Sequence, residues 1–147
     1  MNSLDTNILI YATNENCPEH LAAKEIYERL LKDPLRWIIA DQVLFEFYRA
    51  LRSPRILENP LSAEGAADQI RFLRDEAGSL HCSYEGSFWN EVLGWLARAD
   101  FRPGLIFDLI LAVTLKANGV QRFYTRNIKD FQPLGFFELV DPTALTS

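Results

Sequence analysis

The chain has 147 residues, of which 48% are apolar and 24% are charged, and it contains two cysteines and two histidines. This composition is that of an ordinary globular protein and excludes wholesale disorder and collagen-like repeats. No stretch reaches the roughly 18 apolar residues of a membrane span, and the start lacks the basic and apolar regions of a signal peptide. Without a CxxC pair or a histidine cluster, neither a zinc site nor a disulfide framework is indicated. We therefore expect a single cytoplasmic domain over residues 1–147.

The net charge of −5 comes from 20 acidic and 15 basic residues. A protein that holds nucleic acid by bulk charge alone is typically basic. A function on nucleic acid would therefore depend on a local basic patch, or on metal ions among the carboxylates.

The predicted elements alternate between short strands and helices. The first half predicts a strand over Asn2 to Asp5, a turn or short helix from Asn7, a helix over Glu19 to Lys32, a strand over Trp37 to Ala40 and a helix from an Asp41 N-cap to about Arg52. The second half predicts a helix from a Ser62 cap to about Glu76, an edge strand over Leu80 to Tyr84, helices over Phe88 to Arg98 and Phe107 to Asn118, and strands over Arg122 to Thr125 and Phe136 to Val140. This alternation predicts an α/β fold, with a central parallel sheet flanked by helices. Such sheets place ligands at the carboxyl ends of their strands.

Four acidic residues stand inside or beside apolar runs. Asp5 ends the first predicted strand, and Glu46 lies in a helix between large apolar residues. Asp108 opens the most hydrophobic helix, and Asp130 follows a late strand. A buried, unpaired carboxylate is strongly unfavourable, so each of these acids needs a partner.

Each acid also has a simpler explanation. Asp5 could close a turn with the Asn7 amide, and Asp108 could be only a helix N-cap. Glu46 could pair with Arg49 one turn along its helix. Asp130 could be a solvated loop residue. All four explanations would have to hold separately near one edge of the sheet, so a shared site is the stronger interpretation.

Four converging carboxylates would repel one another and raise each other's pKa. A divalent cation such as Mg²⁺ or Mn²⁺ removes that conflict, because it prefers oxygen ligands and keeps several waters. Such an ion activates water and neutralises charge on a phosphodiester, while a carboxylate that does not bind metal can hold or deprotonate that water. The residues therefore predict metal-assisted phosphodiester hydrolysis.

Four features in this order resemble the PIN domain, and most of all the VapC toxins of bacterial toxin–antitoxin pairs. They are the run LDTNILIYA from Leu4, the isolated Glu46, Asp108 before LILAVTLKANGV, and the run TRNIKDF from Thr125. The resemblance covers essentially the whole chain. It implies a Mg²⁺-dependent endoribonuclease, with Mn²⁺ as a substitute, that cuts structured RNA such as tRNA or rRNA to leave 5′-phosphate and 3′-hydroxyl ends. It also implies a cognate antitoxin and a homodimer.

By position, Asp5, Glu46 and Asp108 match the three acids of the family's metal site. In some members the fourth acid stands where this chain has Asn127, and in others it stands at the position of Asp130. We predict that Asp130 fills this position, with Asn127 assisting through its amide oxygen. In this assignment Asp5, Asp108 and Asp130 hold the metal, and Glu46 positions or deprotonates the attacking water.

Other residues around these motifs carry weaker signals. Thr125 matches the hydroxyl residue that borders the family's site, and Phe107 stands where many relatives have a small or polar residue. Two basic runs flank the predicted site, one of Arg49, Arg52 and Arg55 and the other of Arg122, Arg126 and Lys129. Because Arg suits bidentate phosphate binding, the candidate RNA contacts are Arg49, Arg52, Arg126 and Lys129. The alternative for these side chains is a solvated helix face.

Two rival functions remain at this point. One is a catalytically silent PIN-like scaffold that binds RNA or a protein partner without cleavage. The other is a phosphatase or phosphotransferase that uses Asp5 as a nucleophile. Such enzymes usually carry a second acid two residues further on, where this chain has Asn7.

Overall fold

Short parallel strands form the centre of the molecule. The computed structural model describes residues 1–146, and its strands are β1 (Asn2–Leu4), β2 (Ile38–Ala40), β3 (Leu80–Cys82), β4 (Arg122–Tyr124) and β5 (Glu138–Val140). One sheet has the order β1-β4-β5 and a second pairs β2 with β3, with every pairing parallel. A single bridge between Asn2 and Trp37 joins the two sheets. The predicted α/β class with a central parallel sheet is confirmed.

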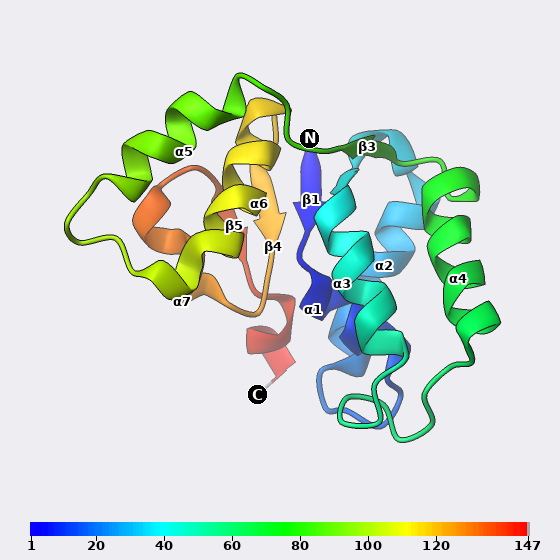
Figure 1. The fold of residues 1–147 in the computed structure, drawn as a ribbon. Coiled ribbons are helices and arrows are strands. Elements are labelled where there is room, and N and C mark those ends of the chain that lie inside the picture. Colours follow the sequence, from blue (N-terminus) through cyan, green and yellow to red (C-terminus); the bar gives the residue numbers. More distant parts are fainter. Residues whose placement is uncertain (147) are drawn as a thin grey trace.

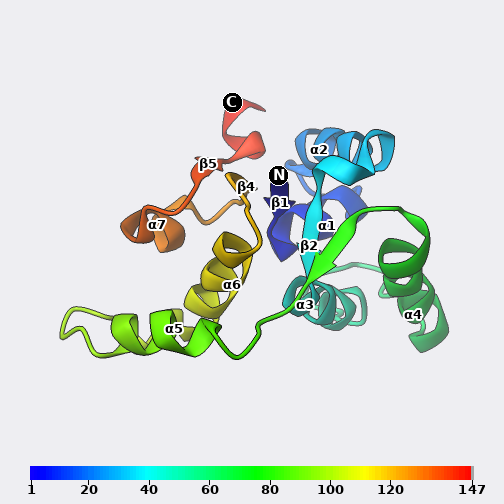
Figure 2. The ribbon, with the colours of Figure 1, turned by 90° about the horizontal axis from the view of Figure 1, so that it is seen from above.

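Helices cover both ends of this row of strands. They are α1 (Thr6–Thr13), α2 (His20–Lys32), α3 (Asp41–Leu51), α4 (Ala63–Arg71), α5 (Phe88–Leu96), α6 (Ile106–Ala117) and α7 (Ile128–Phe131). Figures 1 and 2 show α6 and α7 beside β4 and β5, with α5 on the outer side of α6, while α2, α3 and α4 lie beside β2 and β3. None of the helices in residues 1–146 has the length and apolar character needed to cross a bilayer.

The core fixes the helices that carry the candidate acids. Helix α3 buries Val43, Leu44 and Phe47 along one face, so Glu46 is left at the side of this buried stripe. Helix α6 is buried from Leu111 to Leu115. A smaller apolar cluster, formed by Phe88, Val92, Leu109 and Val113, packs α5 against α6. The acids on α3 and α6 are therefore held by rigid elements.

Most predicted elements are present, with shifted ends. The strand predicted over Asn2 to Asp5 ends at Leu4, because Asp5 caps the following helix. Asp41 is not an N-cap: Ala40 has the extended cap conformation and Asp41 lies inside the first turn of α3. Ser62 does cap α4, since its hydroxyl accepts from the Gly65 N–H at 3.0 Å.

The helix predicted to run from this cap to Glu76 changes character part-way. It is α-helical only to Arg71 and continues as a π-helical turn over Phe72–Glu76. It stops at Gly78, whose φ of +92° is a left-handed conformation that glycine adopts without a steric penalty.

A carboxylate cluster as the candidate active site

Asp5 is held in one orientation at the junction of β1 and α1. Its side chain is only 8% exposed. Oδ1 accepts a hydrogen bond from the Thr6 N–H at 2.8 Å, and Oδ2 accepts one from the Thr125 hydroxyl at 2.8 Å. The Asn7 side-chain amide also approaches Oδ2, at 3.4 Å. The turn with Asn7 that the sequence allowed is thus present only as the longest of these contacts.

The parallel pairing of β1 with β4 brings Thr125 to Asp5. Leu4 is paired with Tyr124, and the Asp5 N–H donates to the Tyr124 carbonyl at 2.8 Å. The residue after each strand therefore lies at the same edge of the sheet. Thr125 is completely buried, so its hydroxyl has a fixed partner. The structure thus places Asp5 and Thr125 together at the carboxyl edge of the sheet.

Glu46 reaches Asp5's neighbour from the facing helix. Its Oε2 accepts a hydrogen bond from the Thr6 hydroxyl at 2.7 Å, and its Oε1 accepts one from Gln42 Nε2 at 3.3 Å. Gln42 Nε2 also donates to the Phe107 carbonyl at 3.1 Å and so connects α3 with α6. The alternative partner, Arg49, forms no ion pair with Glu46 within residues 1–146.

Asp108 is the third residue of α6, whose N-cap is Leu105, so the N-cap explanation of this acid is wrong. Its side chain accepts no hydrogen bond from any residue of the described chain, 1–146. Burial, followed by repulsion from Asp130 and Glu46, raises the pKa of Asp108 to about 6. The charge on this carboxylate is therefore opposed by its surroundings, which is the condition that a bound cation relieves.

Asp130 lies on the short helix α7 and not in a solvated loop. Its carboxylate is 3.9 Å from Arg102, and its charge acts on Asp108. Asn127 takes part differently from the expectation. It is the backbone N–H of Asn127 that donates to the Thr125 hydroxyl, at 3.0 Å, while its side chain is exposed. The carboxylate of Asp130 lies close enough for its charge to act on Asp108, which favours Asp130 over Asn127 for the fourth acidic position. This assignment stays a prediction.

The acids form one electrostatic cluster. Burial raises the pKa of Asp5 to about 6; hydrogen bonds from Thr125 and Thr6 oppose this rise, and the charges of Asp108 and Glu46 add to it. Among residues 1–146, no Lys or Arg forms an ion pair with Asp5, Glu46 or Asp108. The site thus carries negative charge that the described chain does not neutralise.

The donor set fits a hard divalent cation. No three Asp, Glu, His or Cys side chains within residues 1–146 are spaced closely enough to coordinate one ion directly. Mg²⁺ does not need such a cage, because it is usually held by one or two carboxylates together with water and substrate phosphate. Asp5 and Asp108, both carboxylates of raised pKa, provide that arrangement.

The structure adds three residues that the sequence interpretation missed. Thr6 and Gln42 orient Glu46, and Arg102 approaches Asp130. Gln42 stands four residues before Glu46, so helical spacing could have indicated it. The chain carries no comparable signal for Arg102, which precedes α6 and reaches across to α7.

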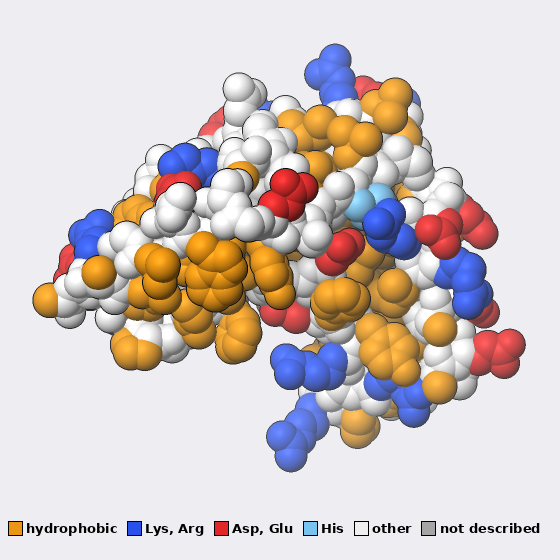
Figure 3. Space-filling view, turned by 45° about the horizontal axis from the view of Figure 1, so that its top comes forward, with side chains coloured by type: hydrophobic (Ala, Val, Ile, Leu, Met, Phe, Trp, Pro, Cys, Tyr) orange, Lys and Arg blue, Asp and Glu red, His pale blue; other side chains and the backbone are white. Residues whose placement is uncertain are grey.

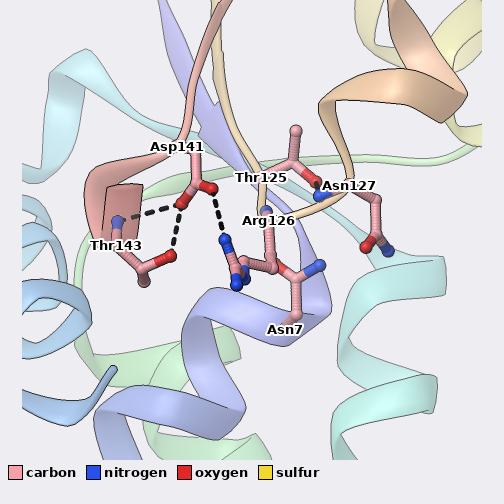
Figure 4. A network of polar contacts seen from close by, with 6 residues as sticks. All are labelled: Asn7, Thr125, Arg126, Asn127, Asp141 and Thr143. Carbon is pink, nitrogen blue, oxygen red and sulfur yellow. Dashed lines mark hydrogen bonds and ion pairs between the residues drawn. The ribbon is translucent and has the colours of Figure 1, made fainter. Parts of the chain in front are cut away.

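The candidate RNA contacts fall into two groups. Arg49, Arg52 and Lys129 are exposed and form no ion pair with any residue of the described part of the chain. Arg126 instead binds Asp141, with 3.0 Å between its guanidinium and the carboxylate Oδ2 (Figure 4). Three of the four side chains are therefore free to contact a polyanion.

An apolar groove lies beside the cluster. It has a volume of about 550 Å³, and its walls include the exposed rings of Phe45, Tyr84, Trp89 and Phe107. Figure 3 shows hydrophobic side chains on both sides of a hollow, with acidic side chains between them and basic side chains at its lower edge. Phe107 is part of this groove wall and is 66% exposed.

Comparison with known proteins gives consistent matches. The PIN domain model matches residues 3–135, a segment that contains all four acids. Ribonuclease VapC24 of Mycobacterium tuberculosis is 38% identical over 145 residues, covering 97% of each chain. Ribonuclease VapC48 of the same organism is 23% identical over 140 residues, covering 95% of this chain and 96% of VapC48.

A solved structure agrees at the level of the fold. The crystal structure of Mycobacterium tuberculosis VapC20, a sarcin–ricin loop cleaving toxin, superposes with a TM-score of 0.69 at 21% identity. The match covers 94% of this chain and 98% of that one.

Proposed function

The chain belongs to the PIN-domain family, and from this premise we propose that it is a metal-dependent endoribonuclease. It hydrolyses RNA phosphodiesters and leaves 5′-phosphate and 3′-hydroxyl ends. The observation that carries the proposal is the buried Asp5 carboxylate, whose pKa is raised in part by Asp108 and Glu46 in a site without a compensating cation among residues 1–146. The similarity to ribonuclease VapC24 supports ribonuclease activity.

Asp5 and Asp108 would hold a Mg²⁺ ion, with Asp130 as a holder of bound water, since no three acids of residues 1–146 lie close enough to share one ion directly. Mn²⁺ would substitute for it, because both ions prefer oxygen ligands. When bound, the ion supplies an activated water and neutralises charge on the phosphodiester. The chain's own part is to keep Asp5 in place, through the hydrogen bonds from Thr125 and the Thr6 N–H.

Glu46 positions or deprotonates the attacking water. Thr6 and Gln42 each donate to a different oxygen of this carboxylate and so fix its plane. Since the catalytic base must lie within hydrogen-bond reach of the water it deprotonates, this fixed orientation favours Glu46 for the role. Thr125 supports the site by holding Asp5.

The substrate is proposed to be structured RNA, such as tRNA or rRNA. Arg49 and Arg52 lie one turn apart on α3 and just beyond its end, and Lys129 lies beside Asp130. These free cations flank the acids from two helices, so phosphates on both sides of the cut can be bound. In an acidic chain such a local arrangement, together with the metal, replaces bulk positive charge.

We place this activity in a type II toxin–antitoxin system in the cytoplasm, with the chain as the toxin. The exposed aromatic side chains of the groove, among them Phe45 and Phe107, support a protein partner, because large exposed apolar patches mark interaction sites. A cognate antitoxin and a second copy of this chain are the two partners proposed.

The test is cleavage of a total tRNA and rRNA pool, with the new 5′ ends mapped. The native chain, Asp5→Asn and the control Asp33→Asn are each incubated with Mn²⁺ and with a chelator. Asp33 is an exposed acid that pairs with Arg36 at 2.9 Å and forms no hydrogen bond with the residues of the cluster within residues 1–146. We expect discrete cuts that need metal, persist in Asp33→Asn and disappear in Asp5→Asn.

Other outcomes contradict the proposal in distinct ways. Cuts that persist in Asp5→Asn would place the active site elsewhere. A folded native chain that binds RNA and Mn²⁺ but leaves every RNA intact would identify a catalytically silent binding scaffold.

A further inference from the structure

The loop that carries Thr125 is anchored from the C-terminal side of the chain. Asp141 directly follows β5, and its side chain is 11% exposed. Its Oδ2 lies 3.0 Å from the Arg126 guanidinium. The family model's match ends at residue 135, so the match itself does not account for this contact.

Asp141 is tied down by more than the ion pair. Its Oδ1 accepts hydrogen bonds from the Thr143 N–H at 2.9 Å and from the Thr143 hydroxyl at 2.6 Å (Figure 4). Burial alone would raise the pKa of Asp141, but the hydrogen bonds from Thr143 and Arg126 outweigh it and hold the pKa below its usual value. The carboxylate is therefore a charged, fixed anchor at neutral pH.

Arg126 passes this anchoring to the site through its backbone. Its N–H donates to the Asn7 side-chain oxygen at 3.2 Å, and the Asn7 amide in turn approaches Asp5 Oδ2. The residues on either side of Arg126 meet at the Thr125 hydroxyl. This hydroxyl donates a hydrogen bond to Asp5 and accepts one from the Asn127 N–H. A displacement of Arg126 would thus move two groups that contact Asp5.

We propose that Asp141 is a positioning residue for Asp5, acting through the Arg126 guanidinium and the loop over residues 125–127. The proposal rests on the ribonuclease function proposed above. It assigns the Arg126 side chain to this anchor and not to RNA. Partners that orient a metal-binding side chain typically contribute about 10- to 100-fold to metal affinity or activity.

The chain offers a matched control at the opposite end of the same two strands. Arg122 on β4 and Glu138 on β5 form an ion pair that is also 3.0 Å long, and no hydrogen bond links it to Asp5. Asp141→Asn and Glu138→Gln remove the same charge and the same kind of contact. Only the first variant breaks the connection to the site.

Kinetics with RNA give the first readout. We expect Asp141→Asn to lower kcat about 10-fold, to raise the Mn²⁺ concentration that gives half-maximal activity, and to leave KM for RNA nearly unchanged. Glu138→Gln should match the native chain, and Asp141→Glu should recover part of the loss. Native kcat and Mn²⁺ dependence in Asp141→Asn would overturn the proposal.

A double-mutant cycle separates anchoring from RNA contact. If Arg126 acts only through Asp141, Arg126→Gln reproduces the kinetic defect of Asp141→Asn, and the double variant is no worse than either. Arg126→Gln also tests the link if Asp141→Asn fails to fold. Additive losses, or a raised KM with steeper salt dependence in Arg126→Gln alone, would assign Arg126 to RNA and contradict the anchor.

Amide hydrogen exchange decides the question without any activity. Asp141→Asn should speed exchange of the Thr125 and Asn127 N–H groups about 10-fold relative to Glu138→Gln, because the loop opens more often. Unchanged exchange would overturn the proposal. If the native chain cuts no RNA, the proposed function fails, but this measurement still tests the anchor.

Discussion

The two sides of the carboxylate cluster are held in different ways. On the β1 and α3 side, Asp5 and Glu46 accept hydrogen bonds from Thr6, and Asp5 also accepts one from Thr125. On the α6 and α7 side, Asp108 accepts no hydrogen bond from residues 1–146, and Asp130 has only the 3.9 Å contact with Arg102.

Asp5 and Asp108 nevertheless have the same raised pKa of about 6, for different reasons. Deep burial of Asp5 is offset in part by its donors, while the lesser burial of Asp108 meets no such compensation. The comparison teaches that hydrogen bonds need to orient the carboxylates on only one side of the site. On the side of Asp108 and Asp130, the carboxylates lack hydrogen-bond donors, and a bound ligand supplies the missing interactions.

The largest expected effect is on cleavage, where the two sides should not differ. Asp5→Ala and Asp108→Ala should each lower kcat about 100-fold or more, because both remove an acid of the cluster. Stability should separate them. At pH 3.5, where the raised pKa contributes little, Asp5→Ala should lower the free energy of unfolding by about 1 to 2 kcal/mol, through loss of the cap and of the Thr125 acceptor.

Asp108→Ala has no hydrogen bond to lose, and at pH 3.5 the acid is protonated in the folded chain and mostly protonated in the unfolded chain, so its free energy of unfolding should stay within about 0.5 kcal/mol of the native value. Urea unfolding of both variants measures this difference. Equal destabilisation would show that Asp108 is held as firmly as Asp5.

The pH dependence of stability comes next in size. Because the folded-state pKa values of Asp5 and Asp108 are raised, the folded chain keeps protons that the unfolded chain loses between pH 4 and 6. Stability therefore falls as pH rises through this window, by about 3 kcal/mol for Asp5 alone. Metal-free urea unfolding from pH 4 to 7 measures it. The double variant Asp5→Asn/Asp108→Asn should lose this slope, and a native slope in that variant would refute the assignment.

Removing one hydrogen-bond donor from the Asp5 and Glu46 side should have a smaller effect on stability and on metal binding. Thr125→Val keeps the shape but removes the hydroxyl, which should lower the free energy of unfolding by about 1 to 2 kcal/mol and weaken Mn²⁺ binding about 10-fold. Isothermal titration with Mn²⁺ measures the latter. Thr114→Val is the control, because this buried hydroxyl donates only to the Ile110 carbonyl within α6. Equal effects of the two variants would remove Thr125 from the site.

The smallest effect on Mn²⁺ binding is expected on the Asp108 and Asp130 side. Arg102→Gln removes the cation near Asp130 and should strengthen Mn²⁺ binding by about 2- to 3-fold, since exposed ion pairs are weak. Arg98→Gln, which breaks the exposed pair with Asp100 nearby, should leave it unchanged. Weaker Mn²⁺ binding in Arg102→Gln would mean that Arg102 supports Asp130 and does not compete for it.

The sequence predicted those parts of the site that depend on chain order alone. Asp5 and Thr125 follow parallel strands, so their meeting at one edge could be derived before the fold was known. Asp108 was predicted for a more general reason, the absence of a partner in an apolar run. The helix predicted from Phe107 already placed Asp108 inside the first turn, and the structure starts this helix one residue earlier, at Ile106.

Contacts between distant elements were beyond reach. The bond from the Thr6 hydroxyl to Glu46 joins residues 40 positions apart, and it depends on how α3 packs beside α1, which periodicity does not encode. The Asp141 anchor is similar, because a carboxylate after the last strand looks like any surface acid. The division into two sheets was also missed, since three-residue strands are too short to reveal their partners.

That division has a mechanical consequence. Between β1 and β2 the backbone is joined only at the Asn2–Trp37 bridge, supported by the Ser3 hydroxyl donating to the Ile38 carbonyl at 2.6 Å. Asp5 directly follows β1, in the sheet β1-β4-β5, and Glu46 lies on α3, the helix that follows β2 in the other sheet. The Thr6 hydroxyl bond to Glu46 crosses this junction. The spacing between the two acids therefore depends on side-chain contacts across the junction and not on a continuous hydrogen-bonded ladder.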